Sequence, residues 1–500
     1  MMNASQRRRR SLPSWLVSVL LHVCCILILA TITLTAPGSH AFYLNGDLEL
    51  KKTNLLQLVS HTTAAQRQDA FDAHISEVDS DLVVESDLIA TEVFQILNLP
   101  GMVEVKEPTA SINSSFHSLE SGAFMNSTDL DNQLSLTNAL EGRSADMKRS
   151  LLLKYGGSQE SEEAVERALQ WLVEHQAQDG GWTFEHTDVC GGQCANPGRM
   201  AVSRNGATAL ALLPFLGAGE THQAGNYRDV VRRGIDFLLI HQEIKSGTHP
   251  VGSWHEVGGT MYSHCLASIA ICEAYAMTGD SRLREPSQLA LNYLVQTQDK
   301  LGGGWRYSPG DPGDTSVVGW ALMAFKSGAI SGLSIPKSTL KGVSRFLDSV
   351  SSGDGASYGY KNPMLKPGGG YATTAIGVLC RMYEGWPLDH RRQVRGVSAL
   401  AAAGPQLGNL YYTYYGSQVL RHHGGPEWHQ WNFQTRDPLI ALQIKQGHAS
   451  GSWLPNSFPE MGGSAGGRLY STCMAAMILE VYYRHMPLYS DKALQDEFKL

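Results

Sequence analysis

The chain has 500 residues, of which 43% are hydrophobic and 17% are charged, and these fractions are ordinary for a soluble globular protein. Its formal net charge is −7 at pH 7. A protein with this balance lacks the excess of basic side chains that binding to nucleic acid requires, so we expect no nucleic-acid partner.

Residues 1–40 predict a membrane-targeting segment. Four arginines at residues 7–10 precede an apolar run at residues 15–34. A helix of about 20 residues covers the ~30 Å hydrocarbon core, and flanking arginines stay on the cytoplasmic side. We therefore expect a single-pass membrane protein whose C-terminal domain lies on the non-cytoplasmic side. A signal peptide cleaved after Ser39-His40-Ala41 is the alternative.

Residues 41–150 differ in composition from the rest of the chain. Acidic side chains clearly outnumber basic ones, tryptophan and cysteine are absent, and no apolar period is sustained. Such a stretch buries too little apolar surface to offset its conformational entropy, so we expect a spacer of low order. Residues 491–500 are expected to form a short tail.

From residue 151 to residue 490 the sequence repeats. Each unit contains an amphipathic helix, a glycine-rich turn that usually ends in an aromatic residue, and a second helix rich in small residues. The clearest turns are Gln178-Asp179-Gly180-Gly181-Trp182 and the segment at residues 298–305. About six such hairpins can be followed, the fifth of them degenerate, and an all-α domain is predicted.

The repeated residues have a simple physical logic. Glycine supplies the positive φ that ends a helix and lets two backbones approach closely. The following tryptophan offers a large apolar face that fixes the turn against its neighbour. Second helices rich in alanine, serine and threonine suit a crowded inner layer, and the more charged first helices suit an outer one.

The glycine-rich turns that end in tryptophan resemble the QW-type repeats of squalene and hopene cyclases and of the β-subunits of protein prenyltransferases. The resemblance implies an α/α-toroid, in which the hairpins form two concentric helix layers. A linear solenoid built from the same hairpins is the structural competitor. Because one fold can carry many functions or none that is catalytic, the activity has to be judged from individual residues.

Cyclases of this family carry an Asp-x-Asp-Asp-Thr motif, whose middle aspartate protonates the polyene. The similar segment here runs from Asp311 to Asp314 and Thr315, and Gly313 stands at the position of the proton donor. The resemblance therefore implies a divergent member in which Asp311 or Asp314 would have to act as the acid. For Asp314, a helix N-cap is the structural alternative.

Other side chains of the expected inner helices are candidates for a cavity lining or for plain core, namely Thr315, Trp320, Tyr371, Tyr412 and Tyr262. His264 lies near the start of the second inner helix, where it would be a candidate acid or base at the mouth of the toroid. A satisfied structural histidine is the alternative.

A long loop follows Trp182 and contains His186, Cys190 and Cys194. These residues could bind zinc with a fourth ligand from elsewhere, for which His255 and Asp188 are candidates. A local disulfide between the two cysteines and a pair of free thiols are the alternatives. No other cofactor is expected.

Three functions remain open. The first is a membrane-anchored toroid that binds a protein, a peptide or a lipid without catalysis. The second is a divergent terpene cyclase or prenyl-lipid-modifying enzyme that uses Asp311 or Asp314, with an isoprenoid as its substrate. The third is a metal- or histidine-dependent enzyme.

Overall fold

The computed structural model describes residues 138–352, 355–364, 370–455, 463–485 and 488. The chain divides into two units, Met1–Val78 and Asp79–Leu500, and all described residues belong to the second. The predicted membrane segment at residues 15–34, most of the predicted spacer and the predicted tail lie outside the described residues. Within the described ranges, no helix combines the length and the apolar character that crossing a membrane requires.

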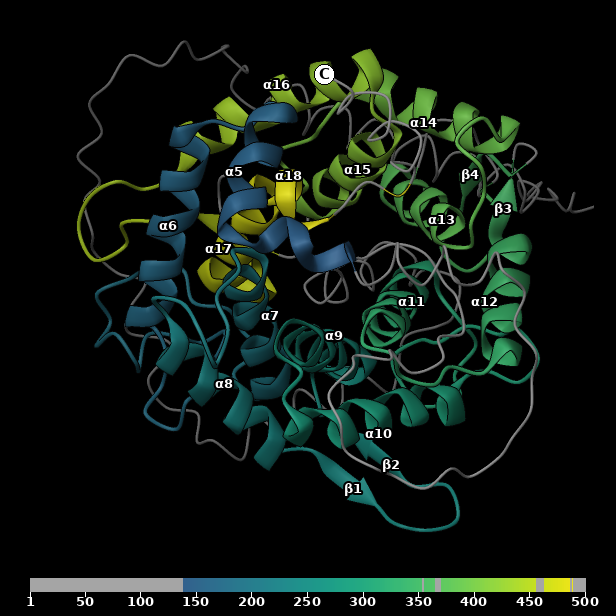
Figure 1. Ribbon diagram of the computed structural model, residues 1–500, viewed down its shortest axis with the longest axis horizontal. Helices are drawn as coiled ribbons and strands as arrows, with labels where there is room; N and C mark the ends of the chain where they lie inside the picture. Colours follow the sequence, from purple (N-terminus) through teal and green to yellow (C-terminus); the bar gives the residue numbers. More distant parts are fainter. Residues whose placement is uncertain (1–137, 353–354, 365–369, 456–462, 486–487, 489–500) are drawn as a thin grey trace, which may run out of the picture. The chain divides into compact units, whose positions relative to one another are not determined.

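Twelve of the described helices form two layers (Figure 1). The outer layer contains α6 (Gln159–Glu174), α8 (Arg228–Ile240), α10 (Ser281–Thr297), α12 (Lys337–Val350), α14 (Arg391–Ala403) and α16 (Gly425–Leu442). The inner layer contains α7 (Arg204–Gly217), α9 (Thr260–Thr278), α11 (Thr315–Ile330), α13 (Tyr371–Tyr383), α15 (Leu410–His423) and α17 (Gly463–Leu479).

The inner helices close into a ring. Each packs on the next in chain order, and α17 packs back on α7. The first hairpin therefore lies beside the sixth, where the outer helix α6 contacts both α16 and α17. The predicted α/α-toroid is confirmed in its helical two-layer arrangement, and this contact between α17 and α7 excludes the linear solenoid.

The two layers differ in burial as their sequences predict. In α9 every side chain from Met261 to Ala274 is buried, and alanine, serine and cysteine make up much of this stretch. The outer helix α6 buries only one face, which includes Ala164, Ala168 and Trp171. An apolar stripe is typical of a helix with one solvent-facing side, and burial all round is typical of an inner helix.

Short antiparallel β-ribbons occur in the turns of two hairpins. In the second hairpin β1 (Glu243–Lys245) pairs with β2 (Val251–Ser253), with Ile244 opposite Gly252. In the fourth, β3 (Ser351–Ser352) pairs with β4 (Ser357–Tyr358), with Ser352 opposite Ser357. Both ribbons extend a turn between an outer helix and its inner partner, so they leave the helical ring unchanged.

The tryptophan of the repeated turn ties the turn to its own outer helix. The indole Nε1 donates to a carbonyl oxygen near the end of that helix in four hairpins, with Trp182 bonded to Leu172, Trp254 to Leu238, Trp305 to Leu294 and Trp453 to Leu439 at 2.6–2.9 Å. Carbonyls in the last turn of a helix lack the regular i+4 amide partner, so each indole adds a hydrogen bond where helical partners run out. The carbonyls of Leu172 and Leu238 also accept the amide of the following histidine, His175 or His241.

In several hairpins the glutamine of the repeat forms a hydrogen bond to the outer helix of the next hairpin. Gln176 Nε2 donates to the carbonyl of Val230 at 2.9 Å, and Gln298 Nε2 donates to that of Thr339 at 2.9 Å. In the last hairpin Gln443 Nε2 donates to the carbonyl of Ala164 at 2.7 Å, which is in the first outer helix. The same interaction that joins neighbours along the chain therefore also closes the ring.

Glycine in these turns permits the close approach of neighbouring hairpins. Gly180 has φ of +92°, and a Cβ built there would lie 2.6 Å from the carbonyl oxygen of Arg233 in the next outer helix. Any other residue would be strained by its backbone angle and would push the two hairpins apart. This confirms the predicted role of the turn glycines.

Three short helical elements, η2 (Asn138–Arg143), α5 (Ala145–Lys154) and α18 (Val481–Arg484), pack on one another, and Arg143 of η2 reaches the C-terminal ends of α7 and α9. Arg143 Nη1 lies 2.7 Å from Glu273 Oε2, and Arg484 Nη2 lies 3.3 Å from the same oxygen. Arg484 Nη1 also pairs with Glu480 Oε2 at 3.2 Å. All four side chains are buried. We call Arg143, Glu273, Glu480 and Arg484 the buried charge network.

The toroid begins earlier in the chain than residue 151, the predicted domain boundary. Residues 138–150 lie in η2 and α5, although the sequence predicts a spacer over residues 41–150. Arg143 holds this segment in the toroid through its ion pair with Glu273. The average composition of residues 41–150 hides this short stretch, because a single buried arginine gives no apolar period.

Candidate functional site

Asp314 is the N-cap of α11. Its Oδ1 accepts a hydrogen bond from the Val317 amide at 2.9 Å and a short one from the Ser316 hydroxyl. The next residue, Thr315, donates its hydroxyl to the Gly359 carbonyl at 2.6 Å, which joins the start of α11 to the turn of the fourth hairpin. The local fold follows from the ability of aspartate to satisfy the free amides of a helix start.

The carboxyl group of Asp314 has surroundings that an ordinary N-cap lacks. The side chain is fully buried, and its Oδ2 lies 3.8 Å from Arg306 Nε and forms no hydrogen bond of regular geometry among the described residues. Burial raises the pKa of Asp314 to about 6, although the hydrogen bonds from Ser316 and Val317 oppose the rise. Such a group changes protonation near neutral pH, as a general acid or base must.

Tyrosines surround this carboxyl group. The Tyr262 hydroxyl lies 2.8 Å from the Ser316 hydroxyl, and the hydroxyls of Tyr307 and Tyr360 lie 2.5 Å apart. Arg306 stacks over the Tyr307 ring at 4.6 Å. Because Arg306, Tyr307 and Tyr360 are only half-buried, they form a layer between solvent and Asp314. We call Arg306, Tyr307, Tyr360, Tyr262 and Asp314 the mouth cluster.

Gly313 has no room for the side chain that a cyclase carries at this position. A Cβ built on Gly313 would lie 2.7 Å from the Gly304 Cα and 2.7 Å from the Phe346 ring. Phe346 belongs to the outer helix α12, so this position faces the outer layer. Asp311 is half-exposed, and its Oδ2 accepts a hydrogen bond from the Ser308 amide at 3.0 Å, as in a surface turn.

The remaining predicted cavity residues fall into two groups. Trp320 is fully buried and packs edge-on against Tyr262 with ring centroids 6.4 Å apart, so it adjoins the mouth cluster. Tyr371 and Tyr412 pack on each other with centroids 5.8 Å apart, and the Tyr412 hydroxyl donates to the Gly404 carbonyl at 3.0 Å. They form a separate contact between α13 and α15.

His264 lies between the two helix layers. Its Nδ1 accepts a hydrogen bond from the Trp254 amide at 3.2 Å, and its Nε2 donates to the Ala290 carbonyl at 3.2 Å. Burial lowers the pKa of His264 to about 3. Thr208 and Thr472 accept the equivalent tryptophan amides in other hairpins, so His264 occupies a structural position of the repeat.

The loop after Trp182 brings its cysteines beside the last hairpin. Cys190 and Cys194 are buried free thiols, and their sulfur atoms, one ring nitrogen of His175 and one of His448 all lie within 4.8 Å of one another. His186 is not part of this group and packs edge-on against Trp171. His255, a candidate fourth ligand, instead contacts the Tyr307 carbonyl at 3.2 Å.

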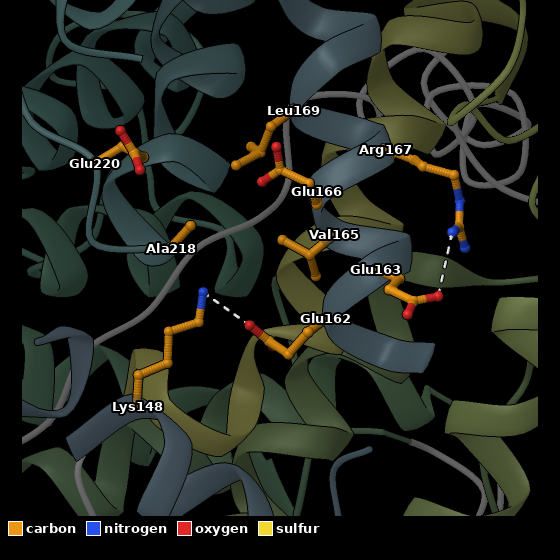
Figure 2. Close-up of a pocket in the computed structure, with 9 residues that line it drawn as sticks. All are labelled: Lys148, Glu162, Glu163, Val165, Glu166, Arg167, Leu169, Ala218 and Glu220. Carbon is orange, nitrogen blue, oxygen red and sulfur yellow. Dashed lines mark ion pairs between the residues drawn. The ribbon is translucent and has the colours of Figure 1, made fainter. Parts of the chain in front are cut away.

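An open pocket of about 410 Å³ lies away from both groups, between α5, α6 and the end of α7 (Figure 2). Its walls are largely charged, and Lys148 pairs with Glu162 at 2.8 Å across it. Glu163 pairs with Arg167 at 3.8 Å. Lys148 and Arg167 thus partly neutralise the carboxylates of this pocket, although Glu162 Oε1 is buried without a hydrogen-bond partner among the described residues.

The sequence matches a known family over part of this architecture. Residues 150–261 match the family "Squalene-hopene cyclase C-terminal domain". These residues contain the first hairpin together with the outer helix and the turn of the second, and they end at the start of α9. The domain is a squalene-cyclase-like α/α-toroid. The matched stretch ends before Gly313 and the mouth cluster.

Several solved structures are similar to this toroid. They include an α-1,6-mannanase of Salegentibacter sp. HEL1_6 in complex with α-1,6-mannotriose (10% identity, 65% of this chain and 99% of that chain, TM-score 0.45). A type II terpene cyclase from Scytonema in complex with geranylgeranyl dihydroxybenzoate has 12% identity over 65% of this chain and 96% of that chain, with a TM-score of 0.42. A protein from Actinoplanes has 14% identity over 65% and 99%, with a TM-score of 0.40. No curated protein matches the sequence.

The sequence did not indicate that His175 and His448 lie beside Cys190 and Cys194. His175 ends the first outer helix as part of a His-Gln pair that recurs at His241, so it resembled an element of the repeat. His448 lies in the last turn, and 254 residues separate it from Cys194. No spacing along the chain indicates such a pair, because only ring closure brings these two segments together.

Proposed function

We propose that the chain is a membrane-anchored, exported toroid that binds an isoprenoid or similar lipid at the mouth cluster and does not cyclise polyenes through the family's motif. The observation that carries this proposal is Gly313. A side chain there would collide with Gly304 and Phe346 at 2.7 Å and would face the outer layer. The acid of the Asp-x-Asp-Asp-Thr motif therefore has no equivalent at this position.

The mouth cluster supports a lipid as the ligand. Tyr307 and Tyr360 present aromatic surface at the N-terminal end of α11, and both are half-buried. Aromatic faces bind apolar chains, and the hydroxyl group at their edge tolerates contact with water. Arg306, stacked on Tyr307, offers a cation for the polar end of such a molecule. The predicted membrane segment would keep the toroid near its lipid source.

A second candidate function rests on the state of Asp314. Its carboxyl group is fully buried and has a pKa near 6, and Oδ2 forms no regular hydrogen bond among the described residues. A protonated carboxyl in an aromatic surrounding can donate a proton to an alkene, and the rings would stabilise the resulting cation. A divergent cyclase that uses Asp314 is therefore the alternative.

One experiment separates the two candidates. The purified full-length chain in detergent is incubated with squalene and with geranylgeranyl diphosphate, and bound ligand and cyclised product are both measured. The proposal expects binding without product, weakened in Tyr307→Ala and unchanged in Phe433→Ala, which removes an exposed aromatic of α16. Product that disappears in Asp314→Asn would establish the second candidate. Absence of both binding and product would refute both.

A further inference from the structure

We propose that Cys190, Cys194, His175 and His448 form a structural zinc site that joins the first hairpin to the sixth. The set contains two thiols and two imidazoles, which is a ligand set that zinc favours in structural sites. All four ligand atoms lie within 4.8 Å of one another, and Cys194 Sγ lies 3.2 Å from His448 Nδ1. Tetrahedral zinc separates such ligand atoms by about 3.4 to 3.8 Å, so small side-chain shifts bring the four atoms onto one ion.

His175 is oriented as a metal ligand requires. Its Nδ1 lies 2.6 Å from the Trp171 carbonyl oxygen, so Nδ1 carries the proton and donates it. The lone pair is then on Nε2, which is buried without a hydrogen-bond partner among the described residues. A ligating histidine usually donates its second ring N–H to a carbonyl, which fixes the ring and its tautomer.

His241 provides an internal comparison. It occupies the equivalent position in the second hairpin, and its Nδ1 makes the same bond to the Phe237 carbonyl at 2.8 Å. The donation to a helix carbonyl is therefore a property of the repeat. His241 is exposed, whereas His175 is fully buried, and one of its ring nitrogens lies within 4.8 Å of both sulfur atoms. Of these two histidines, only His175 has its unprotonated ring nitrogen, Nε2, buried inside the protein.

The backbone between the two cysteines places both thiols on one side. Gly191 has φ of +59° and Gly192 has φ of +73°, and a Cβ on either would have open space around it. These glycines are therefore required by the backbone angles and not by crowding. Two successive residues with positive φ reverse the chain tightly, which directs Cys190 and Cys194 toward the same point.

Arg468 places a buried positive charge close to the two cysteines. Its side chain is 2% exposed, and it donates to the Ala195 carbonyl at 2.8 Å, the Ser452 hydroxyl at 2.9 Å and the Asn196 amide oxygen at 3.3 Å. All three acceptors are neutral, although a buried guanidinium ion favours an anionic neighbour. Zinc-bound thiolates next to it would supply that charge.

Four protein ligands would leave no position open for water or substrate, so the site is structural rather than catalytic. His175 ends α6, the cysteines follow in the next loop, and His448 lies in the turn between α16 and α17. The ion would therefore cross-link the two hairpins that meet where the ring closes. This proposal does not depend on the ligand of the mouth cluster.

The test measures metal directly on the full-length chain, purified in detergent under reducing conditions. We expect about one zinc per chain by elemental analysis, and binding at least ~100-fold weaker in Cys194→Ser and His448→Gln, because the loss of outer partners alone weakens sites 10- to 100-fold. His429→Gln, an exposed histidine of α16, and Cys265→Ala, a buried cysteine of α9, are the matched controls and should retain the metal.

Cobalt substitution makes the result independent of how well the variants fold. The wild-type chain stripped of zinc and loaded with Co²⁺ should show the visible bands of tetrahedral cobalt and a thiolate charge-transfer band. Zinc should also protect two thiols from a thiol reagent. Metal that persists in Cys194→Ser and His448→Gln would show adventitious binding and overturn the proposal. A Cys190–Cys194 disulfide in the native chain would overturn it as well. So would a wild-type chain that is purified without zinc and shows no tetrahedral cobalt bands after Co²⁺ is added.

Discussion

Replacement of Asp314 by asparagine tests whether burial of this carboxyl group costs stability. Asparagine is as good an N-cap as aspartate, so the bond from the Val317 amide can be kept. The substitution removes the charge that burial penalises. We expect Asp314→Asn to stabilise the toroid at pH 7 and to abolish a stability change that the native chain shows between pH 4 and pH 6.

The sign and size follow from the pKa. Burial raises the pKa of Asp314 from 3.8 to about 6. The folded state therefore binds this proton more tightly than the unfolded state, and the resulting stability is full below pH 3.8 and is lost as the pH rises through about 6. A difference of about 2 pH units at 1.36 kcal/mol each corresponds to about 3 kcal/mol. The pKa of about 6 already includes the attraction between Arg306 and the carboxylate, so this value of about 3 kcal/mol needs no further correction for that attraction.

The assay is urea denaturation of the full-length chain and of the variant, followed by tryptophan fluorescence at several pH values between 4 and 7. Other carboxyl groups titrate in this range, so the informative quantity is the difference in unfolding free energy between the two proteins. Asp311→Asn, which changes a half-exposed carboxyl in the same segment, is the control and should show no such difference. Parallel pH profiles, or an Asp314→Asn chain less stable at pH 7, would refute the reasoning and indicate a stabilising ion pair with Arg306.

Three further substitutions test the packing that shapes the toroid. Gly313→Ala should cost about 1–3 kcal/mol in urea denaturation because the added methyl group collides with backbone and ring atoms, and an unchanged midpoint would contradict the crowding. Gln443→Ala should cost about 1–3 kcal/mol because it removes two buried side-chain hydrogen bonds at the ring closure, whereas the exposed Gln430→Ala should be neutral. Glu273→Gln should lower the unfolding free energy by about 3–5 kcal/mol because two buried arginines lose their shared partner, and thermal melting measures this loss.

The sequence predicted the hairpins well because their signals are local and recur. Glycine at Gly180, the following tryptophan and the preceding glutamine each act within a few residues or on the adjacent hairpin, and the structure gives each a defined partner. The closure of the ring was beyond such reasoning. It rests on Gln443 and Ala164, which are 279 residues apart in the chain, and no local pattern reports a contact of that kind.

The sequence indicates several residues of the candidate site, but it does not indicate how they are arranged in space. The sequence shows that Gly313 replaces an acid, and the structure adds that the position faces Phe346. The N-cap alternative for Asp314 is also confirmed, but the layer formed by Arg306 and Tyr307 comes from a loop with no recognisable motif. The role of Asp314 in binding or catalysis stays a prediction.

A toroid differs from a solenoid because its first and last hairpins pack on each other. We call this contact between the first and the sixth hairpin the seam, and its residues explain what holds the ring closed. In an open array each hairpin contacts only its neighbours along the chain, and the terminal hairpins leave apolar faces uncovered. Here α17 covers α7, and the loop that carries Cys194 is held to α17 by Arg468. These contacts are noncovalent and join segments that are distant in sequence, so their formation costs the most loop entropy. A metal ion bound by Cys194 and His448 would place its stabilisation at the same seam, where opening of the ring would have to begin.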